Sequence, residues 1–280
     1  MLQPFRGGLF VDCTTGLGGH SALVLDNGAD RLIGLDRDED ALRIAAERLA
    51  RFGDRVELVH SDYRQLDDVL EAREISGVDG MLADLGVSSL QLEAEGRGFS
   101  FRRDEPLDMR MDRTQGPTAA DRLMDVEEED LANVIFQFGE ERHSRRIARA
   151  IVRQCALGRI ETTGALAAIV RRAVPTRGYQ RIDPATRTFQ ALRIWVNREL
   201  DGLDTFLITA SQRLLAGARL VVISFHSLED RIVKHTFRAI TAASDTWQVL
   251  TRKPMVPGDE EVARNPRARS AKLRAIERLA

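Results

Sequence analysis

Runs of apolar residues, each about the length of a β-strand, recur along the chain. Between two of these runs, residues 38–52 place Ala41, Leu42, Ala45 and Leu49 at helical spacing, with charged residues on the other face. Strands that alternate with such crossover helices predict a parallel α/β sheet. The five predicted strands are residues 8–11, 31–35, 56–60, 78–82 and 220–223.

The alternation stops after the fourth predicted strand and resumes only at residue 220. A loop rich in Gly, Arg and Asp comes first, and no strand-like run interrupts the helical patterns that follow. We therefore expect a helical insertion between the fourth and fifth strands of the sheet. The loop covers residues 92–116, the predicted helices cover 119–137, 140–155, 163–173 and 185–215, and weak alternation at 247–251 and 270–279 predicts two closing strands.

Composition excludes several classes of protein. A chain of 280 residues that is 43% hydrophobic can bury a large core together with a sizeable insertion, so it is neither disordered nor a small stapled protein. Cys13 and Cys155 are the only cysteines and no Cys/His zinc spacing occurs, so we expect a reducing compartment and no metal. No apolar run approaches the roughly 20 residues that a membrane span needs. These features predict a soluble cytoplasmic protein without a membrane partner.

Charge is distributed unevenly along the chain. The net charge is −2, but residues 142–198 hold thirteen Arg, no Lys and two acids, a local charge of +11. Within this segment Arg145, Arg146, Arg149 and Arg153 are spaced three to four residues apart, which places them on one helix face. Arginine forks suit phosphates, so this face is our candidate RNA-binding surface. A solvated helix face is the alternative.

A glycine-rich loop follows the first predicted strand. Gly16, Gly18 and Gly19 let a ligand approach the backbone, and a helix predicted near Ser21 offers free N–H groups. Asp36 ends the second strand twenty residues after Gly16, where its carboxylate suits both hydroxyls of a ribose. The pattern predicts a nucleoside cofactor, although an ordinary strand-to-helix turn is the alternative.

Two details favour S-adenosylmethionine over a dinucleotide. Ser21 replaces the third glycine of the dinucleotide fingerprint. Asp12, just before the loop, suits the cationic amino group of S-adenosylmethionine better than a pyrophosphate. An NAD-type oxidoreductase that uses the same loop and Asp36 remains the rival hypothesis.

Asp84 follows the fourth strand, at the edge where open α/β sheets keep their reacting groups. Enzymes that methylate amines place an Asp or Asn before a tight turn here, so that oxygen atoms hold the N–H bonds of an exocyclic amine. An aromatic amine has its lone pair delocalised into the ring, and orienting its N–H bonds exposes that lone pair to a methyl donor. Asp84 is therefore our catalytic candidate, with simple capping of a turn as the alternative.

Beyond these features, seven separate blocks of the chain resemble the bacterial small-subunit rRNA cytosine-N4 methyltransferases. The blocks occur in the family's order and span nearly the whole sequence. They are DLGVSS at 84–89 followed by Gln91, RGFSF at 97–101, PLDMRMD at 106–112, GEER at 139–142, DPATRTFQALRIWVN at 183–197, SFHSLEDR at 224–231 and NPRARS at 265–270.

The resemblance implies an α/β class I S-adenosylmethionine-dependent methyltransferase fold with a Rossmann-like sheet and a helical inserted domain. It implies S-adenosylmethionine as donor and the exocyclic N4 amine of a cytidine in the decoding centre of 16S rRNA, within the small ribosomal subunit, as acceptor. We expect residues 1–97 and 193–280 to form the catalytic domain and residues 98–192 to recognise RNA. A non-catalytic RNA-binding assembly factor with the same fold is the third hypothesis.

The resemblance also assigns roles to individual residues. Tyr63 stands where the family often has Phe and offers a flat surface to adenine, although core packing is its alternative role. The cofactor-binding residues carried over are Gly18, Gly19, His20, Asp36, Tyr63, Asp84 and Gln91.

Residues outside the cofactor loop complete the predicted site. His226, just past the fifth strand, is a second catalytic candidate, ranked below Asp84, that would line a pocket for a flipped base. Ser227 and Asp230 have the spacing of a capping box. Arg187 and Arg193 join the RNA-binding candidates, with ordering of the active-site rim as the alternative.

The sequence departs from the family at its beginning. Family members usually carry a His-x-Pro-Val and Leu-Leu-x-Glu segment before the first strand, and here only a few residues precede Gly8. We expect the absence of that segment to leave one side of the cofactor pocket more open.

Overall fold

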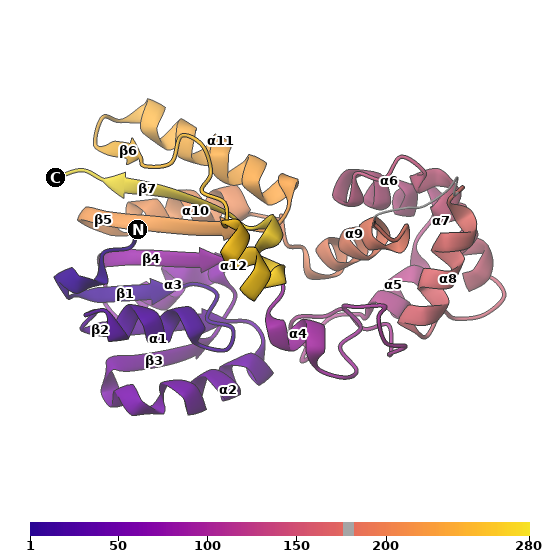
Figure 1. Ribbon diagram of the computed structural model, residues 1–280, viewed down its shortest axis with the longest axis horizontal. Coiled ribbons are helices and arrows are strands. Elements are labelled where there is room, and N and C mark those ends of the chain that lie inside the picture. Colours follow the sequence, from indigo (N-terminus) through magenta and orange to yellow (C-terminus); the bar gives the residue numbers. More distant parts are fainter. Residues whose placement is uncertain (176–181) are drawn as a thin grey trace. The chain divides into compact units, whose positions relative to one another are not determined.

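The computed structural model describes residues 1–175 and 182–280 (Figure 1). The chain forms two compact units. Residues Met1–Gly86 and Leu200–Ala280 form the first, here called the sheet unit, and Val87–Glu199 form the second, the helical unit. Arg177 and Arg181, two of the thirteen clustered arginines, lie outside the described residues. No helix among the described residues combines the length and the apolar character needed to cross a membrane.

The sheet unit, described throughout, contains a seven-stranded sheet of order β3-β2-β1-β4-β5-β7-β6. Neighbouring strands from β3 to β5 are parallel, and β7 is antiparallel to both β5 and β6. This arrangement is the class I methyltransferase sheet, so the predicted fold class is confirmed. The strands are β1 (Leu9–Asp12), β2 (Arg31–Asp36), β3 (Val56–His60), β4 (Val78–Asp84), β5 (Leu214–Ser224), β6 (Trp247–Val249) and β7 (Lys272–Arg278).

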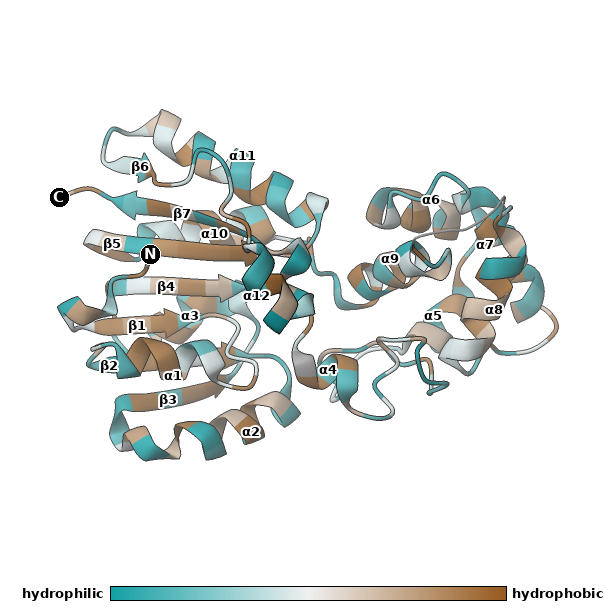
Figure 2. Ribbon diagram, viewed as in Figure 1, coloured by the Kyte–Doolittle hydropathy of each residue, from teal (hydrophilic) through white to brown (hydrophobic). Residues whose placement is uncertain are grey.

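Helices cover both faces of this sheet, because successive strand residues point to opposite sides. Phe10 and Leu32 pack with α1 and α2, whereas Val11 and Ile33 pack with α3, α10 and α11. Figure 2 shows the hydrophobic residues concentrated in the strands. The helices are α1 (Gly19–Asp26), α2 (Glu39–Leu49), α3 (Leu66–Glu71), α10 (Leu203–Gln212), α11 (Ser227–Ala243) and α12 (Asp259–Arg264).

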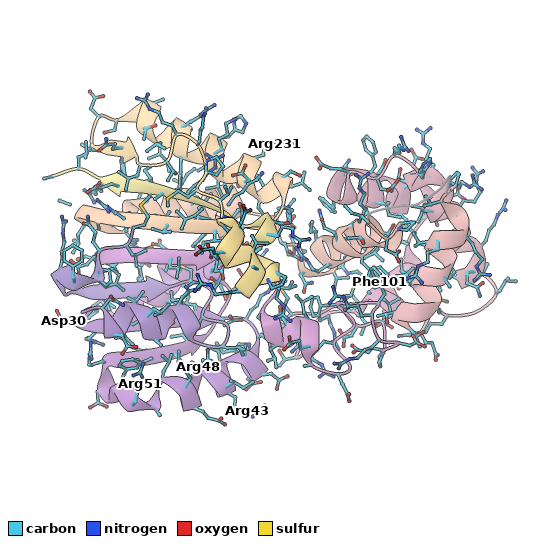
Figure 3. The ribbon with its side chains drawn as sticks, in the orientation of Figure 1. Asp30, Arg43, Arg48, Arg51, Phe101 and Arg231 are labelled. Carbon is cyan, nitrogen blue, oxygen red and sulfur yellow. The ribbon has the colours of Figure 1, made fainter. Side chains whose placement is uncertain are left out.

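Helix α2 shows how the sequence sets the start of a helix and its buried face. Asp38 caps it by accepting hydrogen bonds from the backbone N–H groups of Asp40 and Ala41. Its apolar face is buried, while Arg43 and Arg48 lie on the exposed face (Figure 3). The crossover helix predicted for residues 38–52 therefore exists, although it ends at Leu49 and continues as a 3-10 turn.

The helical unit lies between β4 and β5 along the chain, which confirms the predicted insertion. One hydrophobic core holds its helices together, with Leu131, Ile135, Ile147, Leu166 and Leu192 buried at its centre. The predicted RNA-recognition segment, residues 98–192, lies within this unit. Its helices are α4 (Ser89–Glu93), α5 (Ala119–Asp125), α6 (Glu128–Gly139), α7 (Ser144–Cys155), α8 (Thr163–Ala173) and α9 (Ala185–Asn197).

Two helices predicted as continuous are broken. The helix predicted for residues 119–137 is interrupted at Val126 and Glu127, whose backbones are extended. The one predicted for 185–215 ends at Asn197, since Arg198 adopts a left-handed backbone with φ of 50°, and Gly202 does so with φ of 66° before α10. A left-handed residue cannot continue a right-handed helix, which explains the break at Arg198. Arginine rarely adopts this conformation, so the sequence did not reveal the break.

Candidate active site

Three carboxylates end three neighbouring strands of the sheet unit. Asp12 closes β1, Asp36 closes β2 and Asp84 closes β4, and these strands are adjacent in the order β2-β1-β4. Parallel strands bring their carboxyl ends to one edge, which is where ligands of open α/β sheets bind. The structure therefore brings the predicted cofactor and catalytic carboxylates together at a single edge.

Asp12 fastens the loop that follows β1. Its Oδ1 accepts a hydrogen bond from Thr14 N (3.2 Å), and its Oδ2 accepts one from Ser21 Oγ (2.6 Å). Its side chain is buried, and this burial raises the pKa of Asp12 to about 6 despite the opposing hydrogen bond from Ser21. Within the loop the carboxylate already accepts these two hydrogen bonds, and its predicted contact with the donor's amino group stays a prediction.

The glycines of the loop adopt conformations that other residues avoid. Gly16 has φ of 51°, and Gly18, the N-cap of α1, has φ of 75°. A Cβ at Gly18 would lie 3.1 Å from Leu49 Cδ1. Helix α1 begins at Gly19 rather than near Ser21, and no side chain caps it, so its first-turn N–H groups suit a ligand acceptor.

Asp36 ties the glycine loop to the start of α2. Its Oδ2 accepts from Gly16 N (2.7 Å) and its Oδ1 accepts from Asp38 N (2.8 Å). Burial raises the pKa of Asp36, against these two backbone hydrogen bonds. Each carboxylate oxygen has two acceptor sites, so each keeps one for a hydroxyl group such as those of a ribose.

Asp84 is held in place but keeps acceptor capacity. Its backbone N–H donates to Thr14 Oγ1 (2.6 Å), and its Oδ2 lies 3.4 Å from His20 Nε2. The Oδ1 atom is buried and has no hydrogen-bond partner among the described residues. A buried oxygen of this kind costs free energy unless a ligand donates to it. The hydrogen bond with Asp84 raises the pKa of His20, although partial burial opposes it.

Tyr63 packs within the sheet unit. It begins the short 3-10 turn Tyr63–Gln65 after β3, and its ring centroid lies 4.6 Å from that of Phe206 on α10. The half-buried ring therefore contributes to the core, which was the alternative role considered for Tyr63. Its contact with adenine stays a prediction.

His226 caps a helix. Its Nδ1 accepts from the backbone N–H of Glu229 (3.4 Å), and Glu229 Oε2 accepts from His226 N (3.3 Å) and Phe225 N (2.9 Å). The capping box therefore joins His226 and Glu229, and the one predicted for Ser227 and Asp230 is wrong by one residue. The His226 side chain is only 8% exposed. The catalytic role that the sequence suggested for His226 stays a prediction.

Gln91 belongs to the helical unit. It forms a capping box at the start of α4, where Ser88 N donates to Gln91 Oε1 (3.0 Å) and Gln91 N donates to Ser88 Oγ (3.2 Å). The side chain is buried within that turn. Its predicted contact with a cofactor stays a prediction.

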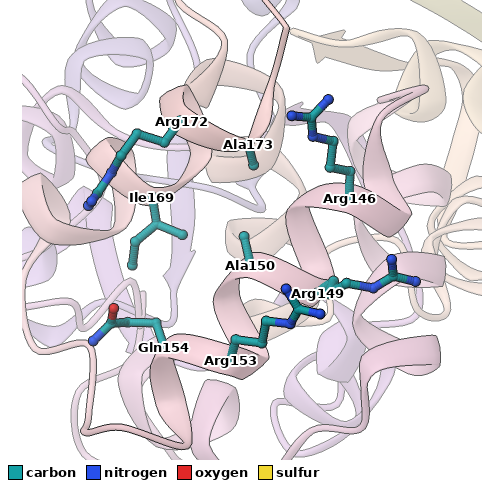
Figure 4. Close-up of a pocket in the computed structure, with 8 residues that line it drawn as sticks. All are labelled: Arg146, Arg149, Ala150, Arg153, Gln154, Ile169, Arg172 and Ala173. Carbon is teal, nitrogen blue, oxygen red and sulfur yellow. The ribbon is translucent and has the colours of Figure 1, made fainter.

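The clustered arginines of α7 are all exposed, but not all of them line the same hollow. Arg145, Arg146, Arg149 and Arg153 are exposed, but only the last three line a hollow of about 500 Å³ between α7 and α8 (Figure 4). Arg172, from α8, completes the lining. The sequence does not identify Arg172 as part of this hollow, because its proximity to α7 depends on how two helices pack and no sequence spacing reveals it.

Arg187 and Arg193 differ from each other. Arg187 is exposed and donates from Nη1 to the backbone oxygen of Glu140 (3.3 Å). Arg193 makes two hydrogen bonds, of 2.9 and 2.8 Å, to the buried carboxylate of Glu199. This bidentate pair engages the Arg193 guanidinium inside the helical unit, which fits its alternative, structural role. Contact with RNA stays a prediction for both Arg187 and Arg193.

Thr14 and Ser21 are the site residues that sequence reasoning missed. Thr14 Oγ1 accepts from Asp84 N, and Ser21 Oγ donates to Asp12. Both stand in the glycine loop, where hydroxyl groups commonly bond to nearby backbone or carboxylates. Their position in that loop was the available signal.

Comparison with known proteins places the chain in a family. Residues 1–279 match the model of the MraW methylase family. Ribosomal RNA small subunit methyltransferase H of Sorangium cellulosum is 51% identical over 278 residues, covering 99% of this chain and 87% of that protein. The proteins of the same name from Bradyrhizobium diazoefficiens and Thermotoga neapolitana are each 50% identical, covering 99% of this chain and 88% and 91% of their own lengths. The match to the family model over nearly the full length shows that this chain belongs to the MraW methylase family and is a methyltransferase.

Proposed function

We propose that this protein transfers a methyl group from S-adenosylmethionine to the exocyclic N4 amine of a cytidine in the decoding centre of 16S rRNA. The names of the relatives, which specify the ribosomal RNA of the small subunit, support the substrate. The position and environment of Asp84 support the chemistry.

The observation that carries the proposal is the buried Oδ1 of Asp84, which has no hydrogen-bond partner in the part of the chain that the structure describes. It offers an acceptor for one N–H bond of an amine at the edge where the sheet places its ligands. Next to it, Gly86 has φ of 96°, which sharply turns the chain that follows the strand. An amine held by Asp84 and by backbone oxygens of this turn presents its lone pair in a fixed direction.

S-adenosylmethionine supplies a methyl group activated by its attachment to a sulfonium. Formation of the N4–carbon bond would be matched by cleavage of the sulfur–carbon bond, and the nitrogen would gain a positive charge that makes its remaining protons acidic. One proton then leaves to water, so a strong base is not required. Asp84 stabilises the positive nitrogen by its negative charge.

The loop residues fit a nucleoside donor. Gly18, Gly19 and His20 stand at the uncapped start of α1, and Asp36 retains an acceptor site on each oxygen for the ribose. Tyr63 would supply the surface for adenine. Gln91 is the remaining proposed cofactor ligand.

RNA recognition belongs to the helical unit in this proposal. Its exposed arginines on α7 supply the positive charge that the acidic remainder of the chain lacks. Activity on the small ribosomal subunit also places the protein in the cytoplasm.

The test is methyl transfer from labelled S-adenosylmethionine to small ribosomal subunits that lack the modification. Digestion of the RNA identifies the labelled nucleoside. We expect N4-methylcytidine at one position in the decoding centre. Label on another nucleoside, or no label while the donor binds in calorimetry, would refute the proposed substrate.

A further inference from the structure

The hollow between α7 and α8 combines a positive rim with a small apolar floor. Arg146, Arg149 and Arg153 come from α7, and Arg172 comes from α8 (Figure 4). Figure 4 shows these side chains arranged around Ala150, Ile169 and Ala173, with Gln154 at the margin. The hollow has a volume of about 500 Å³.

The positive charge of this hollow is poorly neutralised. No acidic residue is among the described residues that line it. Arg149 pairs with Glu128 (3.1 Å), and Arg172 donates to the backbone oxygen of Ala168 (3.2 Å). Among the described residues, no carboxylate lies within ion-pair distance of Arg146, Arg153 or Arg172. Holding several like charges in one hollow costs free energy, which a bound polyanion would recover.

We propose that this hollow binds the sugar-phosphate backbone of the substrate RNA. Arg146, Arg153 and Arg172 contact phosphates, because planar guanidinium groups match phosphate oxygens in two-point hydrogen bonds. The apolar floor of Ile169 and Ala150 accepts the face of a ribose. These contacts fix the RNA on the helical unit without selecting its sequence.

This inference rests on the proposed function and refines it, since it separates the arginines of α7 by role. Arg145 is exposed on the same helix but does not line the hollow. It carries the same charge at an adjacent position and is therefore the matched control. A general electrostatic attraction to RNA would affect all four α7 arginines alike, whereas the hollow predicts a difference.

The experiment measures the affinity of the full chain for small ribosomal subunits that lack the modification, across a range of salt concentrations. The variants are Arg153→Gln, Arg172→Gln, their combination, and Arg145→Gln. Each lost phosphate contact should lower the slope of log affinity against log salt by about 1 and weaken binding by roughly threefold to tenfold near physiological salt. The combination should lose both contacts, whereas Arg145→Gln should lose only the general attraction of one positive charge and keep its affinity within about twofold of wild type. All three side chains are exposed, so thermal melting should confirm that each variant folds.

Two results would overturn the inference. One is that Arg153→Gln and Arg172→Gln bind subunits as Arg145→Gln does. The other is that the variants lose affinity for subunits but keep wild-type affinity for protein-free 16S rRNA, which would make the occupant a ribosomal protein. The methyl-transfer assay with wild-type protein separates the two proposals. Wild-type N4-methylcytidine formation with unaffected variant binding refutes only the hollow, whereas absence of that product refutes the proposed function.

Discussion

His20 Nε2 lies 3.4 Å from Asp84 Oδ2, so the first turn of α1 meets the end of β4 at the edge of the sheet. The two residues are 64 positions apart in the sequence. The contact joins the proposed donor loop to the proposed catalytic carboxylate. It also leaves Asp84 Oδ1 as the oxygen without a partner among the described residues.

The first prediction concerns the pKa of His20. Its hydrogen bond with Asp84 raises this pKa, so Asp84→Asn should bring it down toward or below its ordinary value of 6.5. Because the folded-state pKa is raised, the pair stabilises the fold fully below the ordinary pKa, and the contribution is lost as pH rises through the raised value. Titration of the His20 ring by NMR measures the change.

Asp230→Asn is the control for this titration. Asp230 pairs with Arg274 and Lys272 rather than with His20, so its neutralisation should leave the pKa of His20 unchanged. A His20 pKa that is the same in wild type and in Asp84→Asn would show that the pair does not exist in solution.

The second prediction concerns stability and Asp12. Burial raises its pKa to about 6 from 3.8, so the folded protein binds more protons than the unfolded chain between these values. The free energy of unfolding therefore falls by about 3 kcal/mol as pH rises from about 4 to about 6, because ionisation of the buried Asp12 destabilises the fold. Asp12→Asn removes this dependence while keeping the shape of the side chain.

Urea unfolding of wild type and Asp12→Asn at several pH values measures this effect. The difference in unfolding free energy between the two proteins should shift in favour of the variant as pH rises through this window. If the difference in unfolding free energy between the two proteins stays constant from pH 4 to pH 7, the pKa of Asp12 is not raised by burial.

The third prediction concerns Gly18 in the donor loop. Gly18→Ala places a Cβ on a residue with φ of 75°, 3.1 Å from Leu49 Cδ1. Gly116→Ala is the control, because Gly116 has the same φ but no atom lies within 4 Å of its added Cβ. The shared backbone strain costs about 1–2 kcal/mol in each variant. Only Gly18→Ala should also weaken binding of S-adenosylmethionine, because the loop must shift. Calorimetry measures the affinity of each variant for S-adenosylmethionine. Equal affinity in both variants would remove Gly18 from the proposed pocket.

The fourth prediction concerns Asp36. The two carboxylate oxygens of Asp36 accept hydrogen bonds from the N–H groups of Gly16 and Asp38. Asp36→Asn replaces one of these oxygens with an NH₂ group, which can only donate hydrogen bonds. A hydrogen bond to a charged group is worth about 1.5–3 kcal/mol, so the affinity for S-adenosylmethionine should fall by roughly tenfold to a hundredfold. Asp26→Asn, which removes only an exposed partner of Arg51, serves as the control. Donor affinity within twofold of wild type for Asp36→Asn would exclude the ribose role.

Sequence patterns predicted the parts of the fold that periodicity controls. The strand runs placed Asp36 and Asp84 at strand ends, and the parallel sheet brings strand ends to one edge. Glycine spacing identified the loop after β1 because glycine marks backbone that other residues avoid. The closing strands β6 and β7 were also predicted from alternation alone.

The remaining features depend on conformation or packing that residue type does not reveal. Arg198 ends α9 with a left-handed backbone, which is uncommon for arginine and ran counter to the helical pattern. His226 is an unusual N-cap, so Ser227 attracted the capping assignment instead. Arg172 reaches the α7 arginines only through helix packing.

The central claim is that Asp84 orients the amine for methyl transfer. The most direct test compares wild type with Asp84→Ala in the transfer of label from S-adenosylmethionine to unmodified small ribosomal subunits, with donor affinity measured in parallel. Loss of the orienting carboxylate should lower the rate by about a hundredfold or more, while the variant still binds the donor. Formation of N4-methylcytidine at the wild-type rate by Asp84→Ala would contradict the account.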